Sequence, residues 1–518
     1  MTSAHIPYNK AATQRTIFAA LLSARRQFGG STAALVDGDG RALTYDAILR
    51  AAFALGHALK KGTRRGEAVG VLLPTGAGAT IAFLAISAYG RVPAMLNFTS
   101  GAASLQSAIL TAQVTRVVTA RRFIELGKFE ALEAVLSQNA TLIYLEDVRD
   151  GLGLSDKLAA VAGGFVPRMV AGRDAPEKTA AILFTSGTEG APKGVALSHQ
   201  NILANVAQVR DFLAIYQTDV LFNPLPVFHC FGLTVGTLLP LIAGVKTVCH
   251  PTPLQPHEIV KRIRENKATI LLATDTFMSQ YARVAEPGDL DTLRLAVCGA
   301  ERLREETRTL VRKASSVELL EGYGVTEAAP VVAANPVEDN RHGTVGKLMP
   351  EIEATLEPVE GITGAGLLVI RGPNIMQGYI HADAPGKIVP PVDGWYNTGD
   401  VVSMDGDGFV TIRGRRKRFA KIAGEIVSLT VVENCAAALW PDNHHAAVAI
   451  ADPRRGEQVV LVSDAAHAKR ADLVAWAQHH GVAEISLPRK IITLSALPVL
   501  GTGKLDYPAI QALAEAAE

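Results

Sequence analysis

Cysteine and net charge are both scarce in this chain of 518 residues. Only four cysteines occur, at positions 230, 249, 298 and 435, and none belongs to a C-x-x-C pair. Such wide spacing is not typical of a disulfide framework or a cysteine zinc site, so we expect a protein of the reducing cytoplasm. The 51 Lys and Arg residues nearly balance the 50 Asp and Glu residues. This balance argues against a dedicated nucleic-acid-binding protein, because such proteins usually carry a basic excess.

The chain also lacks a recognisable secretory signal and an uninterrupted apolar span. Residues 1–15 contain no basic cluster followed by a long apolar run, as a signal peptide would. Mean hydropathy is +0.20, and residues 68–90 and 224–245 contain no Asp, Glu, Lys or Arg, which raises the question of a transmembrane helix. Prolines and glycines interrupt both stretches, so we expect no transmembrane span and a buried helix within 224–245. Peripheral contact with the inner membrane stays open.

Short apolar runs alternate with helical patterns through the first part of the chain. Thr44 is placed to cap a helix whose apolar residues Ile48, Ala52, Leu55 and Leu59 share one face. Buried strands are predicted at residues 68–73, 92–96, 180–184, 269–273, 293–297 and 317–320. Apolar strands separated by helices predict an α/β fold of layered, mostly parallel sheets.

The pattern changes after about residue 330. Strands at 367–371 and 409–413 lie between Gly-rich turns without long helices, which predicts a small β-rich subdomain over about 331–414. A compact α+β domain is predicted over 415–518, so that residues 1–414 form the large N-terminal domain. The length agrees with roughly three structural units at about 150 residues each.

A loop rich in small and hydroxyl residues runs from Thr185 to Gly194. It follows an apolar strand and precedes Ser198, the expected start of a helix. Glycine and hydroxyl residues let backbone N–H groups and side chains surround phosphate oxygens, and Lys193 adds positive charge. The loop is not a Walker A motif, because Pro192 and Gly194 stand where that motif needs Gly and Ser or Thr. A flexible surface turn is the alternative interpretation.

Six motifs in a fixed order give the chain its resemblance to the adenylate-forming (AMP-binding) superfamily of acyl-CoA synthetases, adenylation domains and luciferases. They lie at residues 185–194, 225–232, 322–327, 396–400, 413–425 and 501–504. The resemblance covers essentially the whole chain, more weakly before residue 180. It implies an enzyme that uses ATP and Mg²⁺, with a mobile C-terminal domain that rotates about a hinge.

A closer resemblance is to the acyl-ACP synthetase half of bacterial bifunctional acyltransferase/acyl-ACP synthetases. It rests on residues 186–190, 231–236, 298–301, 322–332, 372–376 and 417–425. The acyltransferase module of those proteins is not expected, since the chain has no room for it and Ala204 stands where His199 would need an Asp partner. The resemblance implies a long-chain fatty acid–acyl carrier protein ligase. A fatty acyl-CoA synthetase acting on long-chain or medium-chain acids is the first alternative, and a nucleotide-binding regulatory module is the non-enzyme alternative.

The resemblance assigns the reacting groups. The reaction joins a carboxylate to the α-phosphate of ATP, so positive charge must lie where the two anions meet. Lys504 is assigned this role, and a solvated surface lysine is the alternative. Glu327 would hold Mg²⁺, a hard cation that prefers oxygen ligands, or else form a buried salt bridge. Thr326 would contact the α-phosphate, and His229 would border the junction of fatty acid and AMP or be a satisfied core histidine.

The resemblance also assigns the nucleotide contacts. Tyr323 would stack on adenine, or else pack in the core. Asp400 would bind the ribose hydroxyls with help from Arg415, or else cap the turn after Gly399. The other nucleotide-binding residues are Thr185, Ser186, Gly187, Thr188 and Lys193 of the phosphate loop, and Gly299, Ala300, Glu301 and Gly322 around the base.

Six cations occur between residues 413 and 421. The resemblance places the hinge at Lys417, which leaves Arg416 and Arg418 without a catalytic role. Acyl carrier proteins are acidic, so these two cations are candidates for steering such a partner. A solvated loop is the alternative.

Overall fold

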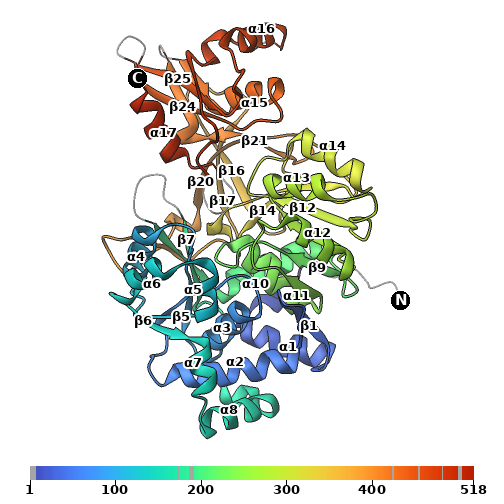
Figure 1. The fold of residues 1–518 in the computed structure, drawn as a ribbon, viewed down its shortest axis with the longest axis vertical. Coiled ribbons are helices and arrows are strands. Elements are labelled where there is room, and N and C mark those ends of the chain that lie inside the picture. The colour runs from blue at the N-terminus through green and yellow to red at the C-terminus, as the bar shows by residue number, and fades with distance from the viewer. Residues whose placement is uncertain are drawn as a thin grey trace. The chain divides into compact units, whose positions relative to one another are not determined.

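The computed structural model describes residues 7–171, 174–185, 192–422, 425–452, 456–480, 482–499 and 505–517. The chain divides into two compact units (Figure 1). Unit 1 takes the described parts of Met1–His342, Leu348–Ile352 and Gly372–Gly394, and unit 2 takes those of Gly343–Lys347, Glu353–Arg371 and Trp395–Glu518. The segment predicted to be β-rich, residues 331–414, is therefore divided between the two units. That the mobile C-terminal domain begins at residue 415 stays a prediction.

The first sheet of unit 1 has eight strands in the order β19-β18-β8-β7-β4-β3-β5-β6. Strands β7, β4, β3, β5 and β6 are parallel, whereas β8, β18 and β19 continue the sheet in antiparallel pairs. The bounds are β3 Ala68–Val71, β4 Val92–Met95, β5 Arg116–Thr119, β6 Thr141–Tyr144, β7 Thr179–Thr185, β8 Lys193–Ser198, β18 Gly378–Ile380 and β19 Ile388–Val389.

The second sheet includes the unit 1 strands β14-β13-β12-β11-β9-β10-β1-β2, in this order. Strands β13 to β1 in this order are parallel, and β14 and β2 are antiparallel to their neighbours. The bounds are β1 Ala33–Val36, β2 Ala42–Thr44, β9 Val220–Asn223, β10 Lys246–Cys249, β11 Ile270–Ala273, β12 Leu295–Gly299, β13 Leu319–Gly324 and β14 Val331–Ala334. The strands predicted from apolar runs are confirmed with small shifts of their ends.

Helices cover both sheets, and local capping explains several of their starts. The Thr44 side chain accepts a hydrogen bond from the Ala47 backbone and begins α2, as predicted. Ser198 and Asn201 cap α10 reciprocally. The helices of unit 1 are α1 Ile17–Phe28, α2 Tyr45–Lys60, α3 Ala77–Ala88, α4 Ala102–Thr111, α5 Arg121–Gly127, α6 Glu130–Ser137, α7 Leu145–Asp150, α8 Leu154–Phe165, α9 Pro167–Val170, α10 His199–Phe212, α11 Leu239–Ala243, α12 Pro256–Glu265, α13 Asp275–Val284 and α14 Glu305–Ala314.

The charge-free stretch 224–245 is buried, as predicted, but its helix is not a regular α-helix. Residues Phe231–Leu238 form a π-helical segment, η2, which continues into α11. The Thr237 hydroxyl donates to the Gly232 carbonyl five residues earlier, and the Asn223 amide donates to the same oxygen. These side chains support the wider turn. None of the helices in the described part of the chain has the length and apolar character that a bilayer crossing requires.

Unit 2 contains two further sheets. The four-stranded sheet β16-β17-β20-β21 is antiparallel, and the other sheet joins β23-β22-β25-β24 with β26 beside β25. Its elements are β16 Glu353–Pro358, β17 Gly366–Arg371, β20 Tyr396–Met404, β21 Val410–Arg415, β22 Phe419–Ile422, β23 Glu425–Ser428, β24 His445–Asp452, β25 Gly456–Ser463, β26 Lys490–Thr493, α15 Leu429–Leu439, α16 Arg470–His480 and α17 Tyr507–Ala516. The α+β character predicted for the C-terminal part is present.

Candidate active site

The carboxyl ends of two neighbouring parallel strands, β12 and β13, bring several predicted residues together in unit 1. Gly299 ends β12 and lies opposite Gly322 of β13. A Cβ atom at Gly299 would lie 3.4 Å from the Gly322 carbonyl oxygen, so the backbones run close together here. Ala300 follows with φ +69 and turns the chain away from the strand. Ligands of open α/β sheets bind at this edge.

Two residues predicted around the base also have structural contacts. A carboxylate oxygen of Glu301 accepts a hydrogen bond from the Thr276 backbone N–H at 2.9 Å, within the first turn of α13. A negative charge is favourable at this end of a helix. Tyr323 is 7% exposed and its backbone pairs with Ala333 of β14. Both residues therefore also serve the fold.

Glu327 lies in the short 3₁₀ turn Thr326–Ala328, which follows β13. It is 7% exposed, and its Oε1 accepts a hydrogen bond of 2.5 Å from the Tyr379 hydroxyl. Within the described ranges its carboxylate forms no ion pair closer than 4 Å, so the predicted alternative of a buried salt bridge is not what these residues show. A tyrosine instead holds the carboxylate in place.

The segment that carries Tyr379 links the Thr326–Ala328 turn to strand β8, which follows the phosphate loop. The Met376 backbone N–H donates to the Glu327 carbonyl at 2.7 Å, and the Asn374 amide donates to the Ala328 carbonyl at 2.7 Å. Two residues further, β18 pairs with β8, with Tyr379 opposite Val195. One short segment therefore holds both the Glu327 turn and β8.

The strand before the phosphate loop and the helix start at Ser198 after it are confirmed. Between the loop and that helix lies a strand that the sequence analysis did not predict, β8, which pairs antiparallel with β7 and sets Thr185 opposite Lys193. The loop thus joins the two strands of a hairpin. The Lys193 ammonium lies 5.3 Å from the centre of the Tyr379 ring. Lys193, Tyr379 and Glu327 consequently form a row, which is called the Lys193–Tyr379–Glu327 row below.

Tyr379 is the functional candidate that the sequence analysis missed. It lies three residues after the motif at residues 372–376, which was the available signal. Its approach to Glu327 depends on the pairing of β18 with β8, which are separated by about 180 residues of chain. Nothing in the local pattern marks a tyrosine in a short strand as a partner of a carboxylate.

His229 stands at the start of the buried π-helical segment. It is half-buried, and its Nδ1 accepts a hydrogen bond from the Phe231 backbone N–H at 3.3 Å. Burial raises the pKa of the adjacent Cys230 thiol to about 12, and the negative charge of Glu327 adds to that increase. This turn therefore lies within electrostatic reach of Glu327.

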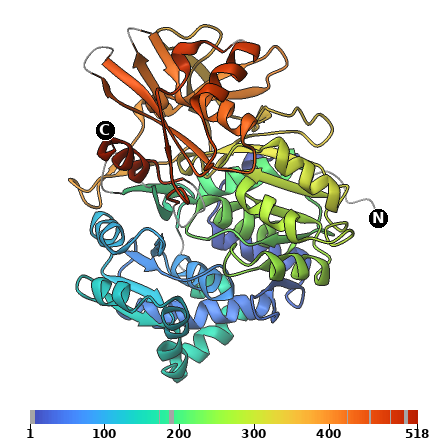
Figure 2. The same ribbon diagram turned by 45° about the horizontal axis from the view of Figure 1, so that its top comes forward.

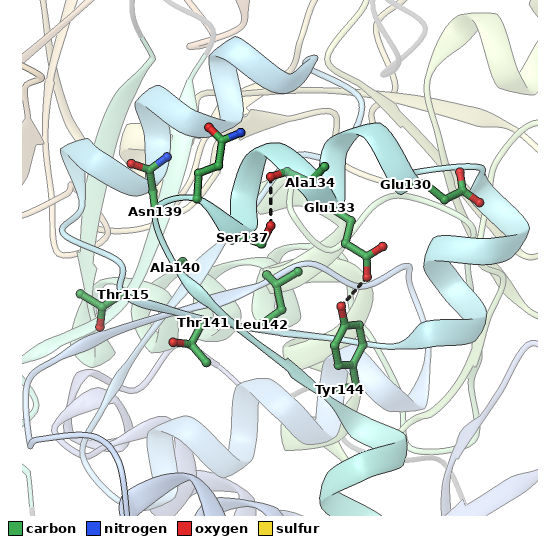
Figure 3. Close-up of a pocket in the computed structure, with 11 residues that line it drawn as sticks. Thr115, Glu130, Glu133, Ala134, Ser137, Asn139, Ala140, Thr141, Leu142 and Tyr144 are labelled. Carbon is green, nitrogen blue, oxygen red and sulfur yellow. Dashed lines mark hydrogen bonds between the residues drawn. The ribbon is translucent and has the colours of Figure 1, made fainter.

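Two cavities in unit 1 differ in character. A narrow, mostly apolar gap lies between α3 and η2, includes Phe83, Val227 and Leu233 in its lining, and is too narrow to hold a water molecule. A hollow of about 640 Å³ between α6 and β6 is lined largely by polar residues, and its Tyr144 donates a hydrogen bond to Glu133 (Figure 3). None of the residues predicted for the site lines this polar hollow.

The two residues predicted to bind ribose meet in unit 2. Asp400 of β20 lies opposite Arg415 of β21, and the Arg415 Nε donates to the Asp400 Oδ1 at 2.9 Å. The Asp400 side chain is 3% exposed, whereas that of Arg415 is 59% exposed. Residues 396–404 form strand β20, and its pairing with β17 is irregular at residues 398–400, where the Gly399 backbone N–H donates to the Asn397 side chain. Gly399 adopts φ +74 within the strand.

Several predicted residues are not tested by the structure. Ser186, Gly187, Thr188 and Lys504 lie outside the described residues. Lys417 belongs to the short helical turn η5, Arg416–Arg418, and its role as a hinge stays a prediction.

Arg418 corrects the interpretation of the basic stretch. Its guanidinium donates to the Ala447 carbonyl at 2.7 Å and to Glu433 at 2.5 Å. It also lies 3.9 Å from the centre of the Tyr507 ring, and its side chain is 17% exposed. Arg418 therefore joins elements within unit 2, because a guanidinium can stack on an aromatic ring while it pairs with a carboxylate. Arg416 is exposed.

Comparison with known proteins identifies the family. The model of the AMP-binding enzyme family matches residues 23–380, and the chain belongs to this family. It is 28% identical over 503 residues to the medium-chain fatty-acid–CoA ligase of Escherichia coli (strain K12), covering 91% of this chain and 86% of the relative. It is 30% identical over 364 residues to the long-chain-fatty-acid–CoA ligase of Salmonella typhimurium, covering 67% of this chain and 64% of the relative.

Solved structures confirm the predicted fold class. ATP-bound MatB from Rhodopseudomonas palustris superimposes with a TM-score of 0.83 at 24% identity, covering 96% of this chain and 99% of that chain. The anthranilate CoA ligase AuaEII in complex with anthranoyl-AMP gives a TM-score of 0.80 at 22% identity, covering 97% of this chain and 98% of that chain. The large part built on parallel sheets and the smaller β-rich C-terminal part are shared.

Proposed function

We propose that the protein is an AMP-forming acid–thiol ligase that activates a fatty acid with ATP and transfers the acyl group to a phosphopantetheine thiol. The observation that carries this proposal is the Lys193–Tyr379–Glu327 row beside the carboxyl ends of β12 and β13. It places a cation, a fixed carboxylate and a glycine-lined strand edge in one region of unit 1. These three features suit a nucleoside triphosphate bound with Mg²⁺.

The residues present suit Mg²⁺ of the kind that accompanies ATP. Within the described ranges, no three His, Cys, Asp or Glu side chains gather to form a metal cage. Mg²⁺ in nucleotide sites is held by one or two carboxylates together with water and substrate phosphates. Glu327 supplies one buried, oriented carboxylate for this purpose. When bound, the ion would offset the negative charge of the phosphates.

Adenylation needs the chain to bring two anions together. A fatty acid carboxylate attacks the α-phosphorus of ATP. The bond between that phosphorus and the oxygen that bridges to the β-phosphate breaks, so that acyl-AMP forms and pyrophosphate leaves. Lys193 would pair with the phosphates, and Thr326 would donate its hydroxyl to the α-phosphate. Lys504 would stabilise the charges where the anions meet, as fixed electrostatic groups do in other enzymes.

The second half-reaction, transfer to the thiol, consumes the acyl-AMP made in the first. The thiol attacks the acyl carbonyl of acyl-AMP, loses its proton to the surroundings, and AMP leaves with the electron pair of the broken acyl–phosphate bond. Asp400, held by Arg415, would accept hydrogen bonds from the ribose hydroxyls and retain the nucleotide during this step. Rotation of the C-terminal domain about Lys417 would exchange the two half-reactions at one site.

Coenzyme A is the acceptor that the relatives favour, since those reported above are named as fatty-acid–CoA ligases of medium-chain and long-chain type. Acyl carrier protein is the second candidate. It rests on the resemblance of the chain to the acyl-ACP synthetase half of bifunctional enzymes at residues 186–190, 231–236, 298–301, 322–332, 372–376 and 417–425. Both acceptors present the same phosphopantetheine thiol, so the chemistry in this chain is common to them.

The decisive measurement is pyrophosphate release with and without fatty acids of increasing length. We expect release to depend on the acid and on Mg²⁺, and the thioester mass to appear with coenzyme A. A parallel reaction with holo acyl carrier protein separates the two acceptors. Nucleotide binding without acid-dependent pyrophosphate release would leave the regulatory-module alternative and refute the proposal.

A further inference from the structure

Helix α8 presents an apolar face to solvent. Leu154, Leu158, Val161 and Phe165 are 76%, 58%, 54% and 84% exposed. Their spacing of four, three and four residues places them on one side of a helix. Large apolar side chains are common singly on protein surfaces, but four in a row on one helix are an interaction surface.

The opposite face of α8 is already occupied by α2. Asp156 is 2% exposed and accepts hydrogen bonds from His57 at 2.7 Å and from Lys61 at 2.9 Å. A Cβ atom at Gly163 would lie 2.2 Å from the Phe53 ring, so the two helices approach closely. Both views place α8 on the outer side of α2 (Figures 1 and 2). The apolar face therefore points away from the core of unit 1.

The charges beside this face are positive. Lys157 lies three residues after Leu154 and four before Val161, which sets it at the edge of the apolar row, and Arg168 lies in α9, which begins at Pro167 just after α8 ends. Both are exposed, and in the described part of the chain neither has an acidic side chain within 4 Å. The only acidic residue of α8 is the buried Asp156. The face thus combines apolar bulk with unopposed positive charge.

We propose that this face of α8 binds the surface of a lipid bilayer that carries anionic headgroups. An amphipathic helix of this kind lies in the plane of the interface, with apolar side chains among the acyl chains and cations at the phosphates. With 12 residues, α8 is too short to cross a bilayer. A second copy is a poorer occupant, because stable protein interfaces use roughly 20–30 residues a side and two such faces would oppose like charges.

Docking at this face would hold the enzyme where amphipathic acids concentrate, and this advantage rests on the proposed function. The docking itself does not depend on the proposed function. It is measured by flotation of the whole protein with vesicles, which needs neither ATP nor a fatty acid nor a thiol. Failure of docking and failure of the ligase activity are therefore distinguishable.

The test compares vesicles of phosphatidylglycerol and phosphatidylethanolamine with vesicles of phosphatidylcholine alone. We expect the wild type to float with the anionic vesicles. The double variant Leu158→Gln, Phe165→Gln should bind roughly tenfold or more weakly, because it loses two apolar side chains from the interface. Lys157→Gln and Arg168→Gln should each weaken binding about fivefold on anionic vesicles and leave the weaker binding to phosphatidylcholine unchanged.

Leu126→Gln is the matched control, since Leu126 of α5 is 74% exposed but stands outside the α8 face. Thermal unfolding checks that each variant is folded, and the single charge variants remain informative if the double variant is not. Three results would overturn the proposal. They are absence of wild-type binding to anionic vesicles, equal weakening by Leu126→Gln, and a wild-type dimer that the double variant converts to monomer with vesicle binding unchanged.

Discussion

Replacing Tyr379 by phenylalanine tests the Lys193–Tyr379–Glu327 row directly. The substitution removes only the hydroxyl that donates to Glu327 at 2.5 Å and keeps the ring beneath the Lys193 ammonium. Because Glu327 is 7% exposed, water replaces this donor poorly. A hydrogen bond to a charged group contributes about 1.5–3 kcal/mol, which corresponds to a factor of about 10–150.

We expect Tyr379→Phe to lower the rate of acid-dependent pyrophosphate release about 10-fold to 100-fold. It should also raise the Mg²⁺ concentration needed for half-maximal activity, because the carboxylate assigned to the ion is no longer held in one orientation. The assay is pyrophosphate release at saturating ATP and fatty acid over a series of Mg²⁺ concentrations. The shift in Mg²⁺ dependence distinguishes a positioning role from a general loss of stability.

Tyr144→Phe is the matched control for this experiment. Tyr144 also donates to a glutamate, Glu133, but in the polar hollow between α6 and β6 (Figure 3). It should leave both the rate and the Mg²⁺ dependence unchanged. If Tyr379→Phe behaves like Tyr144→Phe, the hydroxyl does not position Glu327 for catalysis and the reasoning is refuted.

Four further predictions follow from single residues. Lys504→Ala should slow adenylation on the order of 10²–10³ while thioester formation from supplied acyl-AMP continues, and normal pyrophosphate release would disprove its assigned role. Lys417→Pro should permit acyl-AMP formation but block thiol transfer, because proline fixes φ at the expected hinge. Mass spectrometry measures both products, and equal loss of the two half-reactions would argue for another pivot. Arg418→Glu should lower the thermal unfolding midpoint of unit 2, since it breaks contacts with Glu433 and Tyr507, whereas Arg416→Glu should leave that midpoint unchanged. Hydrogen bonds from Lys61 and His57 lower the pKa of Asp156 to about 2. The ionised Asp156 therefore stabilises the fold above its usual pKa, and this contribution is lost as the pH falls towards 2. The difference in unfolding midpoint between wild type and Asp156→Asn should shrink between pH of about 5 and about 2, and a constant difference would contradict this.

Much of the secondary structure could be predicted because its causes are local. The capping of α2 by Thr44 and of α10 by Ser198 depends on side chains within three residues of the helix start. The buried parallel strands can be recognised in the sequence as continuous apolar runs. The glycines at the ends of β12 and β13 and the acidic turn at Glu327 could likewise be recognised, since each belongs to a short contiguous motif.

The remaining features depend on which distant segments meet. Strand β8 exists because Lys193–Ser198 pairs with β7 on one side and β18 on the other, and only this pairing brings Tyr379 to Glu327. Arg418 counts among solvated cations in the sequence until β24, α15 and α17 supply its partners. The strand at residues 396–404 has the same cause, since its neighbours β17 and β21 lie in other parts of the chain.

Helix α8 shows the division most clearly. The sequence alone determines that residues 154–165 contain an apolar row, and such periodicity ordinarily predicts the buried face of a helix. The tertiary structure decides the opposite, because α2 packs against the side that carries Asp156, Ala159 and Gly163. Small residues permit close approach and a buried carboxylate finds its cations there, so the larger apolar side chains are left facing outward. Periodicity records that a helix has two faces, but which face is covered depends on contacts with residues about one hundred positions away.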